Sequence, residues 1–109
     1  MPALPHTFAA LGNPTRFAIV ERLLSKGELP AGDILPTHEM SAPAISRHIK
    51  ILRQAGIIQQ RVDKQRRIYS VNPQAVQAIN TWSLSYRDFW EKGLDRLAQA
   101  MLYGDKSNG

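Results

Sequence analysis

The residues with the strongest chemical character in this sequence are basic, and they are concentrated between Ser41 and Ser70. Seven of the 14 Lys and Arg residues lie there with a single acid, Asp63, so the segment carries +6. The whole chain carries +5, which leaves −1 for all other residues together. A near-neutral body with one concentrated positive segment is typical of a surface that binds a polyanion. The seven residues are Arg47, Lys50, Arg53, Arg61, Lys64, Arg66 and Arg67.

Side chains that could carry catalysis or bind a metal are few. The sequence has no cysteine, which excludes disulfides and thiolate metal sites. His6, His38 and His48 fall in three different predicted elements and lack the spacing of metal ligands. There is no phosphate-binding glycine loop and no zincin motif. The sequence therefore predicts no catalytic residue, no metal site and no cofactor, and indicates that the protein is not an enzyme.

The first half of the basic segment has strong helix signals. Ser41 is a good N-cap, Pro43 suits the first turn, and Ala55-Gly56 provides a stop. On a helical wheel the aliphatic and basic side chains separate onto opposite faces, so the basic face is predicted to be exposed. The aliphatic face comprises Ile45, Ile49 and Leu52, and the opposite face Pro43, Arg47, Lys50 and Gln54.

The second half has the alternation of a β-hairpin. Residues 57 to 62 and 67 to 71 are rich in β-branched and aromatic side chains. They flank Asp63-Lys64-Gln65-Arg66, which lacks the Asn-Gly signal of a tight turn. We therefore expect a loop of four or more residues at the tip, basic and projecting into solvent.

The remaining elements are predicted to be helical. Residues 5 to 12 form a short helix that ends at a glycine, and residues 14 to 26 form a second helix, capped by Asn13. Residues 28 to 40 predict a short helix that opens at Pro30 and ends by Pro36. From Asn72-Pro73 a single long helix is expected over about 28 residues, interrupted only by Gly93.

The last helix is predicted to be longer than so small a body can cover. At about 1.5 Å per residue it would span roughly 40 Å, and its apolar side chains need a partner, most simply a second copy of the chain. Its aromatic residues Trp82, Tyr86, Phe89 and Trp90 could instead line a ligand pocket. A packed helical seam explains their three- and four-residue spacing more directly.

The length and composition of the chain limit the number of domains and the cellular location that we expect. A chain of 109 residues fits one domain, which we place at residues 1 to 104, followed by a flexible polar tail at 105 to 109. The sequence contains no apolar run of about 18 residues and no signal-peptide pattern at its start. We therefore expect a cytoplasmic protein that does not associate with membranes.

The predicted order, with a basic helix followed by a hairpin and a long helix, is that of a winged helix-turn-helix. Three stretches resemble the ArsR (arsenic-repressor-like) family of transcriptional regulators. They are Phe8-Ala9-Ala10-Leu11-Gly12-Asn13-Pro14-Thr15-Arg16, the block from Ser41 through Ser46-Arg47-His48-Ile49 and Leu52 to Ala55-Gly56-Ile57-Ile58, and Arg67-Ile68-Tyr69-Ser70-Val71. The resemblance implies a mainly α fold with a small β-hairpin, in the order α-α-α-α-β-β-α, and a dimer.

The resemblance also implies partners. It predicts a homodimeric repressor that binds double-stranded DNA at an inverted-repeat operator, with the first and last helices at the dimer interface. The family's metal sites are not matched, because Pro30 and Gly32 stand where thiolates would lie and residues 73 to 104 contain no His. An effector is not identified. The residues that we assign to dimerisation are Phe8, Leu11, Ile79, Trp82, Tyr86, Phe89, Trp90, Leu94 and Leu97.

Roles in DNA binding follow from the resemblance and the helix pattern. Ser46 and Arg47 match the family's base-reading positions, Arg47 being suited to guanine. Ser41 and the first-turn amides, with Pro43 beside them, are placed to hold a phosphate. The other predicted contacts to DNA are Lys50 and Arg53 on the helix and Lys64, Arg66 and Arg67 on the wing.

Two alternatives stay open at this point. His48 lies between the two faces of its helix, where it could pack against a backbone group or contact DNA. Basic side chains are often only solvated surface charges, and a winged helix can also be a module that binds protein or RNA.

Overall fold

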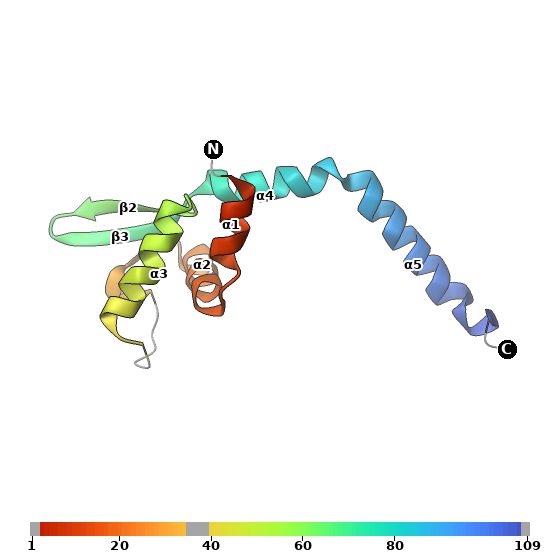
Figure 1. The fold of residues 1–109 in the computed structure, drawn as a ribbon, viewed down its shortest axis with the longest axis horizontal. Coiled ribbons are helices and arrows are strands. Elements are labelled where there is room, and N and C mark those ends of the chain that lie inside the picture. The colour runs from red at the N-terminus through yellow and green to blue at the C-terminus, as the bar shows by residue number, and fades with distance from the viewer. Residues whose placement is uncertain (1–2, 35–39, 108–109) are drawn as a thin grey trace. The chain divides into compact units, whose positions relative to one another are not determined.

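The computed structural model describes residues 3 to 34 and 40 to 107 (Figure 1). Contacts divide the chain into two compact units, residues 1 to 78 and 79 to 109. The elements are α1 (Leu4–Leu11), α2 (Pro14–Lys26), β1 (Glu28–Pro30), the 3-10 turn η1 (Ala31–Asp33), α3 (Ala42–Gln54), β2 (Ile58–Asp63), β3 (Arg66–Val71), α4 (Pro73–Ser85) and α5 (Arg87–Ser107).

Side-chain caps begin three of the helices as the sequence predicts. Asn13 Oδ1 accepts hydrogen bonds from the amides of Thr15 and Arg16 at 2.9 and 3.1 Å, which starts α2. Ser41 Oγ accepts from the Ala44 amide at 3.3 Å and starts α3. Asn72 Oδ1 accepts from the Gln74 amide at 3.1 Å at the start of α4. Each cap satisfies backbone donors that a helix leaves unpaired, so these starts are local properties of the sequence.

The predicted stop of α3 is also confirmed. The Gly56 amide donates to Arg53 O and the Ile57 amide to Leu52 O, both at 3.0 Å. This is the Schellman pattern, which requires a left-handed residue after the helix, and Gly56 has a φ of 76°. The stop directs the chain from α3 into β2.

The core of the first unit lies between α2, α3 and the sheet. Ile19, Leu23 and Leu52 are no more than 1% exposed, and Ile34 is fully buried beside them. Phe17 and Leu24 also belong to α2 but are 49% and 56% exposed, so they lie outside this core. The buried aliphatic stripe of α3 fixes which face of that helix is turned to solvent.

The sheet contains a strand that the sequence analysis does not predict. β1 pairs antiparallel with β3, with Glu28 opposite Ser70 and Pro30 opposite Ile68, and the strand order is β1-β3-β2. The predicted helix opens at Pro30, so the sequence analysis assigns no structure to residues 28 and 29, which lie in β1. Pro30 does precede a helical turn, but that turn is the 3-10 segment η1. A proline is tolerated here because β1 is an edge strand. The predicted end of this helix falls at residues 35 to 39, outside the described residues.

The hairpin is confirmed, but its tip is tighter than expected. Asp63 pairs with Arg66, which leaves a two-residue turn, Lys64-Gln65, in place of the predicted longer loop. Lys64 takes a φ of 59°. Tight turns of this kind need a positive φ at the first turn residue to match the twist of the strands. The chain accepts that conformation at a lysine, so the missing Asn-Gly signal is misleading.

The long terminal helix is broken at Tyr86 and not at Gly93, which lies inside α5. At the break the Tyr86 amide donates to Ser83 O at 3.2 Å, and Ser85 Oγ donates to Trp82 O at 2.6 Å. In a continuing helix the Tyr86 amide would donate to Trp82 O. Here the Ser85 hydroxyl donates to that carbonyl, and the Tyr86 amide donates to Ser83 O, one residue nearer, so the helix ends. α5 extends to Ser107, so residues 105 to 107, which the sequence places in a polar tail, are helical.

Candidate nucleic-acid interface

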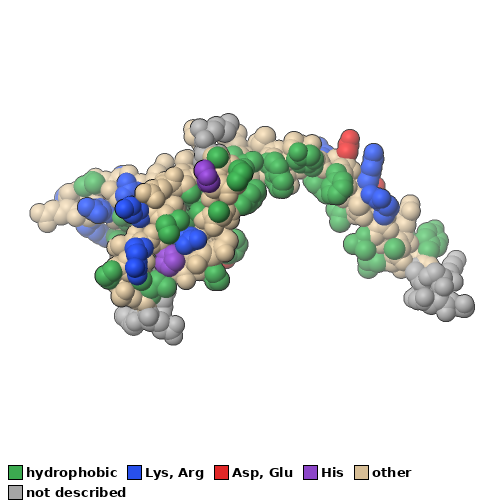
Figure 2. All heavy atoms as spheres, viewed as in Figure 1, with side chains coloured by type: hydrophobic (Ala, Val, Ile, Leu, Met, Phe, Trp, Pro, Cys, Tyr) green, Lys and Arg blue, Asp and Glu red, His purple; other side chains and the backbone are tan. Residues whose placement is uncertain are grey.

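The two faces of α3 separate in the structure as the wheel predicts. Ile49 and Leu52 are 5% and 0% exposed and anchor the helix in the core. Ser46, Arg47 and Lys50 lie on exposed positions of the same helix. Lys and Arg side chains gather over α3 and the hairpin on the face shown in Figure 2. Because the anchor is aliphatic and rigid, the exposed side chains are held at a defined angle to the surface.

The first turn of α3 offers fewer backbone donors than an ordinary helix start. Pro43 has no N–H, and the Ala44 amide donates to Ser41 Oγ. These two positions are therefore not available to a phosphate. The Ser41 hydroxyl still carries a proton that it can donate, since it acts only as an acceptor toward Ala44.

Among the described residues, Arg61 is the one member of the seven basic residues for which the structure gives an ionic partner. Its Nε and Nη2 donate to the two carboxylate oxygens of Glu28 at 3.1 and 2.8 Å. This bond lowers the pKa of the Glu28 carboxyl, so the pair stays charged at neutral pH. Glu28 lies on β1 and Arg61 on β2, so the pair crosses β3, which lies between them. Within the described parts of the chain, the other six basic side chains have neither an ion pair nor a hydrogen bond.

The hairpin presents its charges near the turn. Lys64, Arg66 and Arg67 are exposed, and Val62, which precedes them on β2, is 65% exposed. Ile68 and Tyr69, further along β3, are 7% and 5% exposed and hold the hairpin to the core. The basic end of the hairpin therefore extends beyond the packed part of the unit (Figure 1).

A polar hollow of about 390 Å³ joins the end of α3 to the base of the hairpin. Lys50, Arg53 and Gln54 line it from α3, and Gln59 and Gln60 line it from β2. The glutamines were not among the predicted contacts, because a glutamine that is neither charged nor at a helix N-terminus carries no sequence signal for phosphate binding. Their position beside two cations makes this hollow suitable for a backbone phosphate.

His48 is packed rather than fully exposed. It is half-buried, and its Nδ1 lies 3.3 Å from Nη1 of Arg16 in α2. Arg16 Nε donates to Ala10 O, in the last turn of α1, at 2.7 Å. Burial, followed by the charges of Arg16 and Arg47, lowers the pKa of His48 below its ordinary value of 6.5. The packing partner is thus a side chain, where the sequence analysis considered a backbone group.

Arg16 is the main residue that sequence reasoning left without a role. It lies in the stretch from Phe8 to Arg16 that carries the family resemblance, yet nothing in its local sequence shows that it reaches α3. Its partner is 32 residues away along the chain.

The residues assigned to dimerisation differ in exposure. Leu11 is half-buried and packs against the core of its own unit, whereas Phe8 on the same helix is 41% exposed. Ile79 is half-buried, and the others are exposed. Those exposed residues are Trp82, Tyr86, Phe89, Trp90, Leu94 and Leu97.

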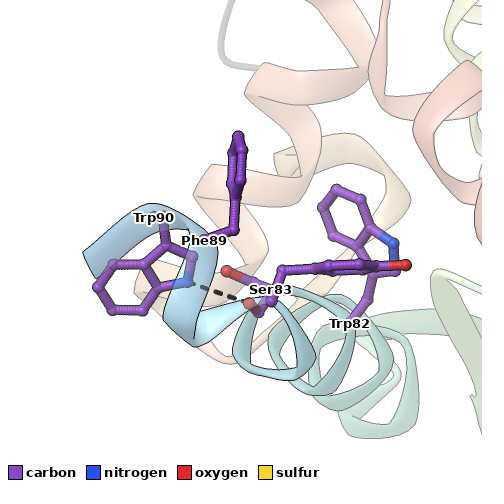
Figure 3. Close-up of a pocket in the computed structure, with 5 residues that line it drawn as sticks. Trp82, Ser83, Phe89 and Trp90 are labelled. Carbon is purple, nitrogen blue, oxygen red and sulfur yellow. Dashed lines mark hydrogen bonds between the residues drawn. The ribbon is translucent and has the colours of Figure 1, made fainter. Parts of the chain in front are cut away.

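The break between α4 and α5 shapes an aromatic hollow of about 510 Å³ within the second unit (Figure 3). Trp82 and Tyr86 meet edge to face with ring centroids 5.9 Å apart. The indole N–H of Trp90 donates to Ser83 O at 3.1 Å, so the ring is tied to the end of α4. Phe89 completes the lining and is 75% exposed. The wall is almost wholly apolar, which suits either a packed helix or an apolar ligand.

No three His, Asp or Glu side chains in residues 3 to 34 and 40 to 107 come together in a way that could hold a metal ion. Within the same ranges, no helix has the length and apolar character needed to cross a membrane.

A basic helix anchored by an aliphatic stripe and followed by a basic hairpin defines the winged helix-turn-helix class. A family model described as a helix-turn-helix domain matches residues 11 to 61. HTH-type transcriptional regulator Rv2034 of Mycobacterium tuberculosis is 37% identical over 90 residues, which cover 83% of this chain and 80% of that protein. Transcriptional repressor SdpR of Bacillus subtilis is 37% identical over 81 residues, 74% of this chain and 89% of that protein.

A solved structure agrees with the sequence relatives. The crystal structure of an ArsR family transcriptional regulator matches with a TM-score of 0.70 and 27% identity, over 81% of this chain and 90% of that one. The chain belongs to the ArsR family of winged helix-turn-helix transcriptional regulators. It is a DNA-binding regulator and not an enzyme, and the predicted family and fold class are confirmed.

Proposed function

We propose that this regulator is a homodimeric repressor that binds an inverted-repeat operator with one α3 helix in the major groove of each half-site. The observation that carries the proposal is the exposed face of α3. It presents Arg47 and Lys50 on the side opposite the buried Ile49 and Leu52, with Ser46 exposed beside them. A helix fixed in this way can insert into a major groove without disturbing its own core.

Each exposed side chain then has a role set by its position. Ser46 and Arg47, in the first half of α3, contact base edges, with Arg47 placed for a bidentate contact to guanine. Lys50 and Arg53 contact the DNA backbone near the polar hollow, and Ser41 donates its hydroxyl to a phosphate beside Pro43. The hairpin residues Lys64, Arg66 and Arg67 bind phosphates or enter the flanking minor groove.

Two observations support a dimeric repressor. Ten large apolar side chains between Trp82 and Tyr103 are more than a third exposed, a surface that a second copy would cover. SdpR, which is similar over most of its length, is named a transcriptional repressor. A two-fold dimer would present two α3 helices, so the half-sites should lie about one helical turn apart, or a multiple of that distance.

The proposal is tested by selecting bound duplexes from a random pool with the full chain and comparing Arg47→Ala with wild type. We expect an inverted repeat to be enriched, and Arg47→Ala to weaken binding to it by roughly 10- to 100-fold, the effect of one lost base contact. Lys26→Ala, at the end of α2, removes the same charge from an exposed position outside the basic face and serves as the control.

Two results would contradict the proposal. One is a selection that enriches no duplex. The other is a folded Arg47→Ala variant that binds the selected duplex as tightly as Lys26→Ala does.

A further inference from the structure

We propose that Arg16 and His48 form a positioning pair that holds α3 in register with α1 and α2, and that protonation of His48 releases α3 and lowers the discrimination between operator and other DNA. The inference rests on the proposed binding of α3 in the major groove. Arg16 and His48 would act on DNA binding only through the position of α3. At acidic pH the regulator would lose specificity for its operator.

Arg16 lies on α2 and contacts both α1 and α3. Its Nε donates to Ala10 O at 2.7 Å, and its Nη1 lies 3.3 Å from His48 Nδ1. Carbonyls in the last turn of a helix lack intrahelical partners, so Ala10 O accepts this bond at no cost to α1. The guanidinium is planar and presents its donors in a fixed fork, so one side chain ties α1, α2 and α3 together.

The bond to Arg16 determines the state of the imidazole. A guanidinium can only donate, so His48 Nδ1 must accept, which requires a neutral ring with its proton on Nε2. His48 directly follows Arg47 and lies two residues after Ser46 on α3. A shift of the His48 ring would therefore move the turn of α3 that carries Ser46 and Arg47, the proposed base contacts.

Protonation of His48 would reverse this contact. Nδ1–H would then face Nη1–H, so two donors and two positive charges would oppose each other. Arg47, on the same helix, adds a third charge, and His6 from α1 lines the same surface hollow as Arg16. Among the described residues, the charges that act on His48 are those of Arg16 and Arg47, and both disfavour its charged form.

The direction of the pH effect follows from these surroundings. Burial and the two arginines lower the pKa of His48 below 6.5, so the neutral ring and the intact pair are present at neutral pH. The pair is lost as the pH falls below 6.5 and through the lowered pKa of the folded state. The added charge alone would strengthen binding to any DNA, so the informative quantity is the affinity ratio between operator and non-operator duplexes.

The test measures this ratio at about pH 8 and about pH 5.5, at constant salt, with the duplex recovered by selection and a scrambled duplex of equal length. For wild type we expect the ratio to fall by roughly fivefold, about the net loss of one ordinary hydrogen bond. His48→Asn keeps an acceptor near the position of Nδ1 but does not titrate, so its ratio should not depend on pH. Arg16→Lys keeps the charge without the fork, so its ratio should already be low at about pH 8.

His6→Asn is the matched control, since it removes a histidine beside Arg16 without touching the pair. It should keep the pH dependence of wild type. The proposal would be overturned if His48→Asn still lost specificity at acidic pH, or if His6→Asn abolished the effect.

A measurement without DNA separates this inference from the proposed function. In ¹⁵N-histidine NMR of the free protein, His48 should show the Nε2–H tautomer at neutral pH, and Arg16→Ala should raise its pKa. A ring with its proton on Nδ1, or a pKa unchanged in Arg16→Ala, would overturn the pair even if operator binding is found. If the selection enriches no duplex but these NMR results hold, the pair stands and the groove-binding proposal fails.

Discussion

Arg61 and Arg66 carry the same charge on the same hairpin but have different surroundings. Arg61 is held by both carboxylate oxygens of Glu28, a residue outside the basic segment. Arg66 closes the two-residue turn, is exposed, and has no ionic partner in the described part of the chain. A charge already paired within the protein releases few counterions from DNA. Six of the seven basic side chains of the segment are therefore available to phosphates, and Arg61 is not.

This difference predicts unequal effects on salt dependence. Arg66→Gln should reduce the slope of log Kd against log salt by about one, the effect of one lost phosphate contact, because its side chain is free to reach the backbone. Arg61→Gln should leave the slope nearly unchanged, since Arg61 is engaged with Glu28. Binding of a labelled duplex at several KCl concentrations measures both. Equal slopes for the two variants would show that the pair with Glu28 opens on DNA.

At the scale of elements, helices and strands could be predicted where residues close in sequence determine them. They could not be predicted where distant residues do. The caps Asn13, Ser41 and Asn72 bind amides two or three residues away, so the helix starts could be predicted. β1 could not, because three residues have no usable period and their pairing depends on β3, about forty positions later. The break at Tyr86 depends on Ser85 and Trp90 bonding to carbonyls of α4, which spacing alone does not indicate.

Gly93 and Gly56 differ in backbone conformation, because Gly93 lies inside a helix and Gly56 has a positive φ. Gly93 lies inside α5, and a Cβ added there would meet no atom within 4 Å. Gly93→Ala should therefore stabilise α5 by roughly 0.5–1 kcal/mol and raise the helical signal in circular dichroism. Gly56→Ala should lower the free energy of unfolding by about 1 kcal/mol or more, because its φ of 76° is unfavourable for a residue with a Cβ. A Gly93→Ala variant with weakened self-association would instead show that a partner packs closely at this position.

At the scale of the whole molecule, the charge and the exposed apolar surface lie on different parts of the chain. The basic side chains belong to α3 and the hairpin, and the large exposed apolar side chains are concentrated between Trp82 and Tyr103. Composition and spacing could predict both sets. They could not predict which members are engaged, because the Arg61–Glu28 and Arg16–His48 contacts join residues 33 and 32 positions apart. Pairwise contacts of this range are properties of the folded unit.

If α5 forms the proposed dimer interface, self-association should depend on Leu94 and not on the equally exposed Leu24. Leu94 on α5 and Leu24 on α2 are both 56% exposed, so their surroundings within one chain are comparable. Leu94→Asp should weaken self-association by roughly a hundredfold, since the two-fold axis brings two such carboxylates into one apolar interface. Leu24→Asp should leave the dimer intact. Sedimentation equilibrium measures both, and operator affinity should fall only for Leu94→Asp, because a monomer presents a single α3. An unchanged dimer in Leu94→Asp would remove α5 from the interface, and loss of the dimer in Leu24→Asp would place the interface on α2.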